Sequence, residues 1–427
     1  MSRTNIATVK GRQVWDSRGR PTVEAEVALK GGTTGRAIAP AGASTGSGEA
    51  VDLRDGGTKF GGFGVARAVA NVSGEIDKAL AGLDGANQEA IDRTLIELDG
   101  TDNKSRLGGN AAIAVSMAVA HAAAAAQKLP LWRHLLGDGE VILPLPEIQI
   151  FGGGAHAGAR IDLQDVMIMP VGADSFAQAM AWTAEVYRAA GLNMADSGRL
   201  TGVADEGGYW PNFETNEEAL AETVRAIERA GLRPGEQVAL SLDIAATQLR
   251  KQGRYWLTIE DRCFERAQFG ELLLDWAARF PIASIEDPFA EDDTEGMIEF
   301  TKTAGERLQV IGDDTLVTNA DRVRAAARDK ACNAVLIKPN QAGTLSETKA
   351  ALDAGKEAGF ATIVSARSGE SEDVSIVHLA IGWSAGQLKV GSFARSERMA
   401  KWNEALRIEE QCAGRSRFAG ASALAGR

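Results

Sequence analysis

Cysteine, histidine and positive charge are scarce in this sequence of 427 residues. The 3 cysteines lie far apart and form no Cys-x-x-Cys motif, so neither a disulfide framework nor a zinc site is expected, and a reducing cytoplasm fits. Asp and Glu number 58 against 46 Lys and Arg, and the net charge of -12 argues against general nucleic-acid binding, which needs a basic face. A small anionic ligand is compatible with this composition where cations gather locally.

Long apolar segments are also missing. Residues 1–5 contain no apolar signal core, and the most apolar helical stretch, residues 111–126, is alanine-rich and short for a membrane span. We therefore expect a packed helix there and no contact with a membrane. Apolar residues make up 44% and charged residues 24%, which is normal for a soluble enzyme with one large α/β domain and one smaller domain.

Residues 1–135 predict an N-terminal α+β capping domain. Residues 21–30 alternate apolar and polar side chains, as a half-buried antiparallel strand does, and residues 35–39 return after a Gly-Gly turn. Helical patterns follow, and strands followed by helices favour the α+β class. The small residues of 40–49 between them fit either a flexible surface loop or a lid that closes over a ligand.

Residues 136–413 predict a (β/α)8-type barrel, a TIM-like α/β fold. Short apolar runs alternate with helical stretches, and repeated βα units of this length imply parallel strands that close into a barrel. Several runs end at a charged residue, and a barrel carries its active site at that end of its strands. These residues are Asp243, Glu286, Asp313, Lys338, Arg367 and Lys389. Residues 414–427, rich in Gly, Ala, Ser and Arg, predict a flexible tail.

The charges at the strand ends predict a metal-assisted reaction on an anion. Carboxylates such as Asp243, Glu286 and Asp313 cannot share a small site unpaired, and Mg²⁺ is the cation that such oxygen ligands favour. The cationic strand ends would then hold an anionic substrate. This arrangement suits removal of the proton next to a carboxylate, with Lys338 as the base, its pKa lowered by neighbouring cations.

Several segments, in a fixed order, carry a resemblance to a known family. They are Asp16–Glu24, Gly42–Gly46, Ser284–Pro288, Gly312–Asp314 and Leu406–Glu410. Across residues 14–410 the chain resembles the enolase (phosphopyruvate hydratase) family. The resemblance implies a Mg²⁺-dependent hydro-lyase that converts 2-phosphoglycerate to phosphoenolpyruvate, with two Mg²⁺ in each active site, in a homodimer or higher homo-oligomer.

The resemblance also implies roles for individual positions. Lys338 matches the base, Glu206 matches the acid that helps hydroxide leave, and Asp165 stands beside Glu206. The first Mg²⁺ would be held by Asp243, Glu286 and Asp313, and the second by Ser44 once the lid closes. Arg367 and Ser368 match phosphate ligands, and Lys389 faces the substrate carboxylate. The full set of implied substrate-binding residues is His156, Gln164, Arg367, Ser368, Lys389, Ala43 and Ser44.

Some positions in the site differ from the family pattern. Asp165 replaces a glutamate, which withdraws the carboxylate by about 1.5 Å. Ala366 replaces a histidine next to the phosphate ligands. The lid and the glycine-rich loop after it also carry small residues in place of the family's usual ones, at Ala41, Ser47, Gly48 and Gly152.

These differences permit two interpretations of the reaction, and a third interpretation comes from another class. The first is a working enolase whose sequence has drifted. The second is a paralogue that forms carboxyphosphonoenolpyruvate in phosphonate natural-product biosynthesis, because smaller side chains beside the phosphate site would admit an extra phosphorus substituent. In both, the substrate is a small phospho- or phosphono-carboxylate. A non-catalytic enolase-like binding protein is disfavoured, since Lys338, Glu206 and the carboxylates are intact.

Overall fold

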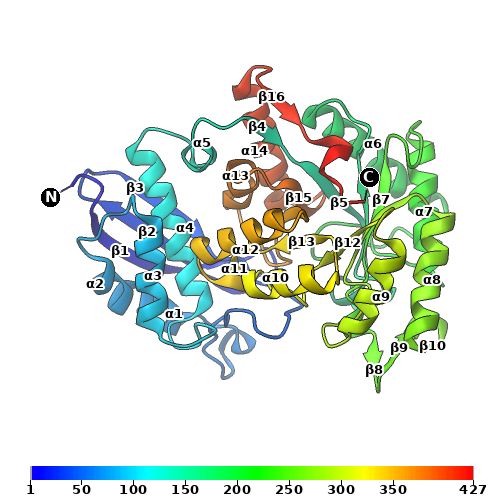
Figure 1. The fold of residues 1–427 in the computed structure, drawn as a ribbon, viewed down its shortest axis with the longest axis horizontal. Helices are drawn as coiled ribbons and strands as arrows, with labels where there is room; N and C mark the ends of the chain where they lie inside the picture. Colours follow the sequence, from blue (N-terminus) through cyan, green and yellow to red (C-terminus); the bar gives the residue numbers. More distant parts are fainter. Residues whose placement is uncertain (1, 427) are drawn as a thin grey trace.

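The computed structural model describes residues 2–426, which form an N-terminal domain and a closed barrel next to it (Figure 1). The N-terminal sheet has the order β1 (Ile6–Trp15), β2 (Pro21–Leu29) and β3 (Thr34–Ile38), with antiparallel neighbours. The alternating segment 21–30 therefore does form a strand. Its apolar side chains, such as Val23, are fully buried.

Helices of the N-terminal domain cover this sheet. α1 (Ala66–Asn71), a π-helical turn (Val72–Ile76), α2 (Asp77–Leu80) and α4 (Gly109–Ala126) contact its strands, and α3 (Gln88–Asp99) packs against α4. Among the described residues, α4 is the one helix long and apolar enough to cross a membrane, yet 83% of it is buried inside the protein. A Cβ added at Gly35 of β3 would lie 2.2 Å from the α4 backbone, so the strand lies directly on the helix. The prediction of a packed core helix is confirmed.

Within the described residues, eight strands close into the barrel, with β15 pairing with β5. They are β5 (Leu145–Gly152), β6 (Asp165–Met169), β7 (Ala239–Asp243), β11 (Ile282–Glu286), β12 (Gln309–Gly312), β13 (Ala334–Ile337), β14 (Ala361–Ser365) and β15 (Gly386–Ser392). β6 runs antiparallel to both neighbours, so the expectation of parallel strands throughout is wrong there. A parallel neighbour needs a crossover, usually a helix, whereas the link from β5 to β6 contains only a 3₁₀ turn at Gly154–His156.

The helices of the barrel domain lie outside the ring of strands (Figure 1). Ser175, Thr215 and Thr344 accept a backbone N–H at the start of α6, α7 and α12, which is the usual N-cap arrangement. The remaining elements are α5 (Leu131–Leu136), α6 (Phe176–Asp196), α7 (Asn216–Arg229), α8 (Arg266–Arg279), α9 (Thr294–Ala304), α10 (Ala320–Asp329), α11 (Pro339–Ala342), α12 (Leu345–Glu357), α13 (Ser375–Gly382), α14 (Ser396–Cys412), β4 (Val141–Leu143), β8 (Arg250–Lys251), β9 (Arg254–Leu257), β10 (Arg262–Phe264) and β16 (Ser416–Phe418).

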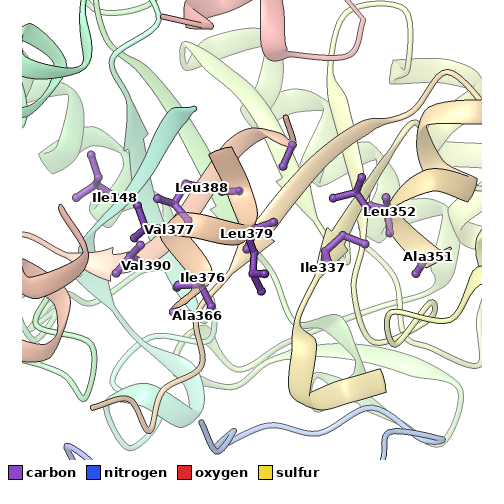
Figure 2. Packing of buried hydrophobic residues seen from close by; sticks show 14 of the residues in the cluster. Ile148, Ile337, Ala351, Leu352, Ala366, Ile376, Val377, Leu379, Leu388 and Val390 are labelled. Carbon is purple, nitrogen blue, oxygen red and sulfur yellow. The ribbon is translucent and has the colours of Figure 1, made fainter. Parts of the chain in front are cut away.

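An apolar layer between strands and helices decides which side chains face the barrel interior. Ile337 of β13 lies in this layer near Leu352 of α12 (Figure 2). Its neighbour Leu336 belongs instead to a separate cluster inside the barrel. Because side chains alternate along a strand, Lys338 follows Ile337 and turns inward again. Packing of β13 against α12 therefore aims the lysine at the barrel axis.

The inside of the barrel is divided between apolar and polar side chains. The apolar cluster is formed by Ile311, Ala334, Leu336 and Ile363. Gln309 and Gln387 hydrogen-bond to each other across the barrel at 2.8 and 2.9 Å. Other strands of the barrel contribute further buried polar residues, namely Glu147, Ser241 and Ser284.

Residues 414–426 close the barrel at the N-terminal ends of its strands, so the expected flexible tail is wrong. β16 pairs with β4, and Leu424 packs against Leu145 at the start of β5. The side chain of Gln387 donates a hydrogen bond to a backbone carbonyl of the tail at 2.9 Å. The polar composition of the tail indicated disorder, but its few apolar side chains fill a gap that exists only once the barrel has closed.

Candidate active site

The charged residues predicted from strand ends meet at one mouth of the barrel. Asp243 and Glu286 are the last residues of β7 and β11 and lie opposite each other in the register of these strands. Asp165 is the first residue of β6 and lies opposite Asp243. Because β6 runs antiparallel, its first residue reaches the mouth at which the parallel strands end. The three carboxylates therefore stand on adjacent strands.

One cavity is lined by most of the predicted site residues. They come from the lid, from the loops after β5 and β14, from the loop between α6 and α7, and from the strand ends. Those that line it are Ala43, Ser44, His156, Gln164, Asp165, Glu206, Asp243, Lys338, Arg367, Ser368 and Lys389. Glu286 and Asp313 lie next to the cavity, in contact with Lys389 and Lys338. The structure thus brings together the whole predicted set.

Lys389 is the cation at the centre of the carboxylates. Its Nζ lies 2.7 Å from Glu286 Oε2, 3.0 Å from Asp243 Oδ2 and 3.6 Å from Asp165 Oδ2. Burial alone would lower the pKa of Lys389, but Asp243 and Glu286 outweigh it and hold the pKa well above its ordinary value. Lys389 is therefore a permanent positive charge in this arrangement.

Lys338, the predicted base, lies against Asp313. Its Nζ donates to Asp313 Oδ2, and its backbone N–H donates to Thr318 Oγ1 at 2.9 Å. Burial lowers the pKa of Lys338, but the carboxylates of Asp313 and Glu286 together raise it by more, so the pKa lies above its ordinary value. The expectation of a lowered pKa is wrong for this arrangement, because the two carboxylates outweigh burial and the cations Arg367 and Lys389.

His156 lies between two carboxylates. Its Nδ1 lies 2.9 Å from Asp165 Oδ1, and its Nε2 lies 3.8 Å from Glu206 Oε1. Burial alone would lower the pKa of His156, but Asp165 and Glu206 raise it to about 9, so the imidazole is charged at neutral pH. Gln149 Nε2 also donates to Asp165 Oδ1. The shortened acid is thus held by His156 and Gln149, beside Glu206.

The lid lies over Arg367 and is bound to it. Arg367 Nη2 donates to Ser44 O at 2.7 Å, and Nη1 pairs with Glu49 Oε2 at 2.9 Å. A Cβ at Gly42 would lie 2.0 Å from Arg367 Nη2 and 2.7 Å from Ser44 O, so the lid backbone passes directly against the guanidinium. The segment 40–49 is therefore an ordered lid in this structure, which was one of its two predicted forms.

Two charged residues of the site were not assigned a role from the sequence. Arg18 Nη1 donates to Ser368 Oγ at 3.2 Å, and Glu49 holds Arg367. Arg18 belongs to the segment Asp16–Glu24 that carried the family resemblance, so that resemblance was the signal available for it. Nothing in the local sequence distinguishes Glu49 from any other acid at the end of a loop.

The predicted magnesium ligands are Asp243, Glu286 and Asp313. Among the described residues, the groups whose ligand atoms all lie within 4.8 Å of one another are His156, Asp165 and Glu206, and Asp287, Asp313 and Asp314, so of the predicted set only Asp313 belongs to such a group. Lys389 binds between Asp243 and Glu286. Glu286 Oε1, however, is buried and has no hydrogen-bond partner among the described residues. Burial and the Asp243 charge raise the pKa of Glu286 well above its ordinary value. An oxygen-liganded divalent cation relieves both problems, so these residues fit magnesium.

The fold and the site together define a lyase-type α/β-barrel enzyme in which an N-terminal domain supplies a lid over buried acids and lysines. Each of the two domains matches a family model. Residues 6–135 match the N-terminal domain of enolase, and residues 140–426 match the C-terminal TIM barrel domain of enolase. The chain therefore belongs to the enolase family, whose members generally use Mg²⁺.

Proposed function

We propose that this protein dehydrates 2-phosphoglycerate to phosphoenolpyruvate. The observation that carries the proposal is that Lys338 and Glu206 line one cavity together with Arg367, Ser368 and Lys389. A base and an acid thus face the same small volume, and cations for a phosphate and a carboxylate line it too. This combination matches a phosphorylated hydroxy-acid substrate.

Each side chain has one task in the proposed reaction. Arg367 and Ser368 bind the phosphate, and Lys389 faces the carboxylate. The α-proton moves to Lys338 Nζ, the C–O bond to the β-hydroxyl breaks, and the hydroxyl leaves as water with a proton from Glu206. A magnesium ion held by Asp243, Glu286 and Asp313 would supply positive charge at the carboxylate oxygens, where negative charge develops. If Asp313 held the ion, the carboxylate that contributes most to the raised pKa of Lys338 would be shared with it.

A second candidate reaction, formation of carboxyphosphonoenolpyruvate, is favoured by Ala366. This residue is buried and lines the cavity beside Ser365 and Arg367. Its methyl group leaves space next to the phosphate site that a larger side chain would fill. An additional phosphorus substituent on the substrate would use that space.

The first experiment is an absorbance assay of phosphoenolpyruvate formation from 2-phosphoglycerate with Mg²⁺. Turnover of about 1–10³ per second supports the dehydration. Absence of product, while solvent deuterium still enters the α-position, supports the second candidate, because base and metal would work and the leaving step would not. Absence of both product and exchange contradicts both reactions and favours a binding protein.

Lys338→Ala tests the assignment of the base. The variant should lose α-proton exchange completely while still binding Mg²⁺, because Asp243 and Glu286 remain. Exchange is measured by NMR in deuterium oxide, and Mg²⁺ binding by calorimetry. Exchange at the wild-type rate in the variant would show that another group removes the proton.

Asp165→Glu separates the two candidate reactions. If the protein is a drifted enolase, the longer side chain brings the carboxylate about 1.5 Å closer to the substrate and should raise kcat for 2-phosphoglycerate by about 10- to 100-fold. Steady-state kinetics measure this, and the thermal midpoint serves as a control for overpacking at this fully buried position. A folded variant with unchanged or lower kcat would contradict the drift interpretation.

We also propose that the protein forms a homodimer or larger homo-oligomer. The support is an exposed aromatic pair on the N-terminal domain. Trp15 is 51% and Phe60 40% exposed, and their rings meet edge to face at 5.2 Å. Aromatic surface of this kind is common at contacts between subunits. Light scattering that shows only the mass of a single chain would contradict the proposal.

A further inference from the structure

Glu147 is a buried carboxylate that neither the proposed reaction nor the predicted metal site uses. It lies in the middle of β5, faces the barrel interior and has no exposed surface. Oε2 accepts one long hydrogen bond, from Ser241 Oγ at 3.4 Å. Oε1 has no hydrogen-bond partner in residues 2–426. Such a group is unfavourable inside a protein unless it protonates or pairs with a cation.

The cation nearest in the fold is Lys389. Lys389 and Glu147 are register partners on the neighbouring strands β15 and β5. Burial raises the pKa of Glu147 to about 7, and the Lys389 charge limits the rise, while Asp243 adds to it. The Lys389 ammonium itself points to the upper level of the barrel interior, which is the level of the strand ends at the mouth, and there it binds Glu286 and Asp243. Lys389 thus has carboxylates on two levels of the barrel: Glu286 and Asp243 at the mouth, and Glu147 below them.

Metal binding would compete with Lys389 for the upper level. The oxygens that the ammonium contacts, Glu286 Oε2 and Asp243 Oδ2, belong to residues that fit a magnesium site. An ammonium that loses these oxygens next to a divalent cation needs another counter-ion. Asp165 Oδ1 is already bound by His156 and Gln149, whereas its Oδ2 lies 3.6 Å from Lys389 Nζ and has no hydrogen-bond partner among the described residues. Glu147 Oε1 is the other neighbouring oxygen without a partner, and it lies on the neighbouring strand, in register with Lys389.

We propose that Glu147 is a positioning residue that pairs with Lys389 when Asp243 and Glu286 bind magnesium. The flexible four-carbon stem of lysine permits the ammonium to move between the two levels. Glu147 would hold the charge of Lys389 at the floor of the cavity, below the substrate carboxylate that this lysine faces. The inference rests on the metal site of the proposed function but does not depend on which substrate is dehydrated.

Glu147→Gln tests the inference because it removes the charge and keeps the shape. Magnesium binding to metal-stripped protein is measured by isothermal titration calorimetry, with circular dichroism to check the fold. We expect the affinity to fall about 10- to 100-fold, because Lys389 would stay on Asp243 and Glu286 and compete with the ion. Ser241→Ala, which removes the hydrogen bond and keeps the carboxyl group of Glu147, is the matched control and should change the affinity by less than about threefold.

A double-mutant cycle with Lys389→Met shows whether the effect passes through the lysine. In that background Glu147→Gln should change magnesium affinity by less than about threefold, since no ammonium remains to be accommodated. An equal loss in both backgrounds would mean that Glu147 acts only as a distant negative charge, and it would overturn the inference. Unchanged affinity in the single variant, or wild-type protein that binds no magnesium, would overturn it as well.

The substrate and the positioning role can fail separately. If the affinities follow the expected cycle but 2-phosphoglycerate is not converted, the role of Glu147 stands and the proposed substrate is wrong. If 2-phosphoglycerate is converted and Glu147→Gln binds magnesium normally, the reaction stands and the role of Glu147 is wrong.

Discussion

Lys389, His156 and Arg367 are each buried against carboxylates, and these contacts set the charge of the site at the residue scale. Lys389 contacts Glu286 at 2.7 Å, and Arg367 contacts Glu49 at 2.9 Å. A buried ion pair is expensive to break by removing one partner, because the remaining charge is left without compensation. Binding of a cation or an anion here must therefore exchange partners and cannot simply add a charge.

The charge of His156 makes a contribution to stability that depends on pH. Its pKa of about 9 in the folded protein lies above the ordinary 6.5, so the folded state binds the proton more tightly than the unfolded chain does. This stabilisation is complete below pH 6.5 and is lost as the pH rises through about 9. The free energy of unfolding of the wild type should therefore approach that of His156→Gln as the pH rises.

Urea unfolding of both proteins at about pH 6 and about pH 9.5 measures this difference. The Gln variant also corrects for other groups that titrate in the same range. A gap between the two proteins that stays constant, or grows with pH, would show that His156 is not held protonated by Asp165 and Glu206.

At the scale of elements, the lid and β6 decide the shape of the site. The lid is fixed by one buried carboxylate, since Glu49 accepts from Arg367, from the Gly46 N–H at 2.9 Å and from Gln341 Nε2 at 3.2 Å. β6 brings Asp165 to the mouth because it runs antiparallel. Both features depend on contacts with residues far away in the sequence.

Glu49→Gln should loosen the lid. The neutral side chain weakens the contact with Arg367, so backbone amides of residues 42–48 should exchange with solvent roughly tenfold faster or more. Hydrogen–deuterium exchange followed by mass spectrometry measures this. Glu291→Gln is the matched control, because Glu291 accepts the Ser47 N–H at 2.8 Å in an exposed position and should matter less. Equal effects of the two variants would contradict the role of Glu49.

At the scale of the whole molecule, the barrel is closed from both ends. The N-terminal domain supplies the lid at the mouth, and residues 414–426 seal the opposite end. Leu424 packs with Leu145 and Met169 in a cluster separate from the main core. The C-terminal segment therefore contributes to the stability of the barrel, even though it lies at the end opposite the candidate site.

Leu424→Ala should lower the free energy of unfolding by about 2–4 kcal/mol, because a buried leucine would be replaced by a cavity. Urea unfolding measures the change. Ser422→Ala in the same segment is a suitable control, since Ser422 is exposed and bonds locally to Ala419 O at 2.6 Å. A loss below about 0.5 kcal/mol for Leu424→Ala would show that the tail is peripheral.

The sequence by itself determined the class of fold and which residues form the candidate site. Alternation in residues 21–30, repeated βα units and charges at strand ends are local patterns, and they place Asp243, Glu286 and Lys338 correctly because parallel strands all end at one mouth. The family resemblance added His156, Gln164 and the lid to the same cavity. These features can be predicted without knowing which distant residues contact one another in the fold.

Only the tertiary structure decided which side chains and strands contact one another. The antiparallel direction of β6, the packing of Leu424, the contact of Asp313 with Lys338 and the unpaired Glu147 depend on residues far apart in the chain. A pKa depends on burial and on which charges lie within a few ångströms, and neither is readable from local spacing. For that reason the sequence predicted a lowered pKa for Lys338 and a flexible tail, and the folded barrel shows the opposite.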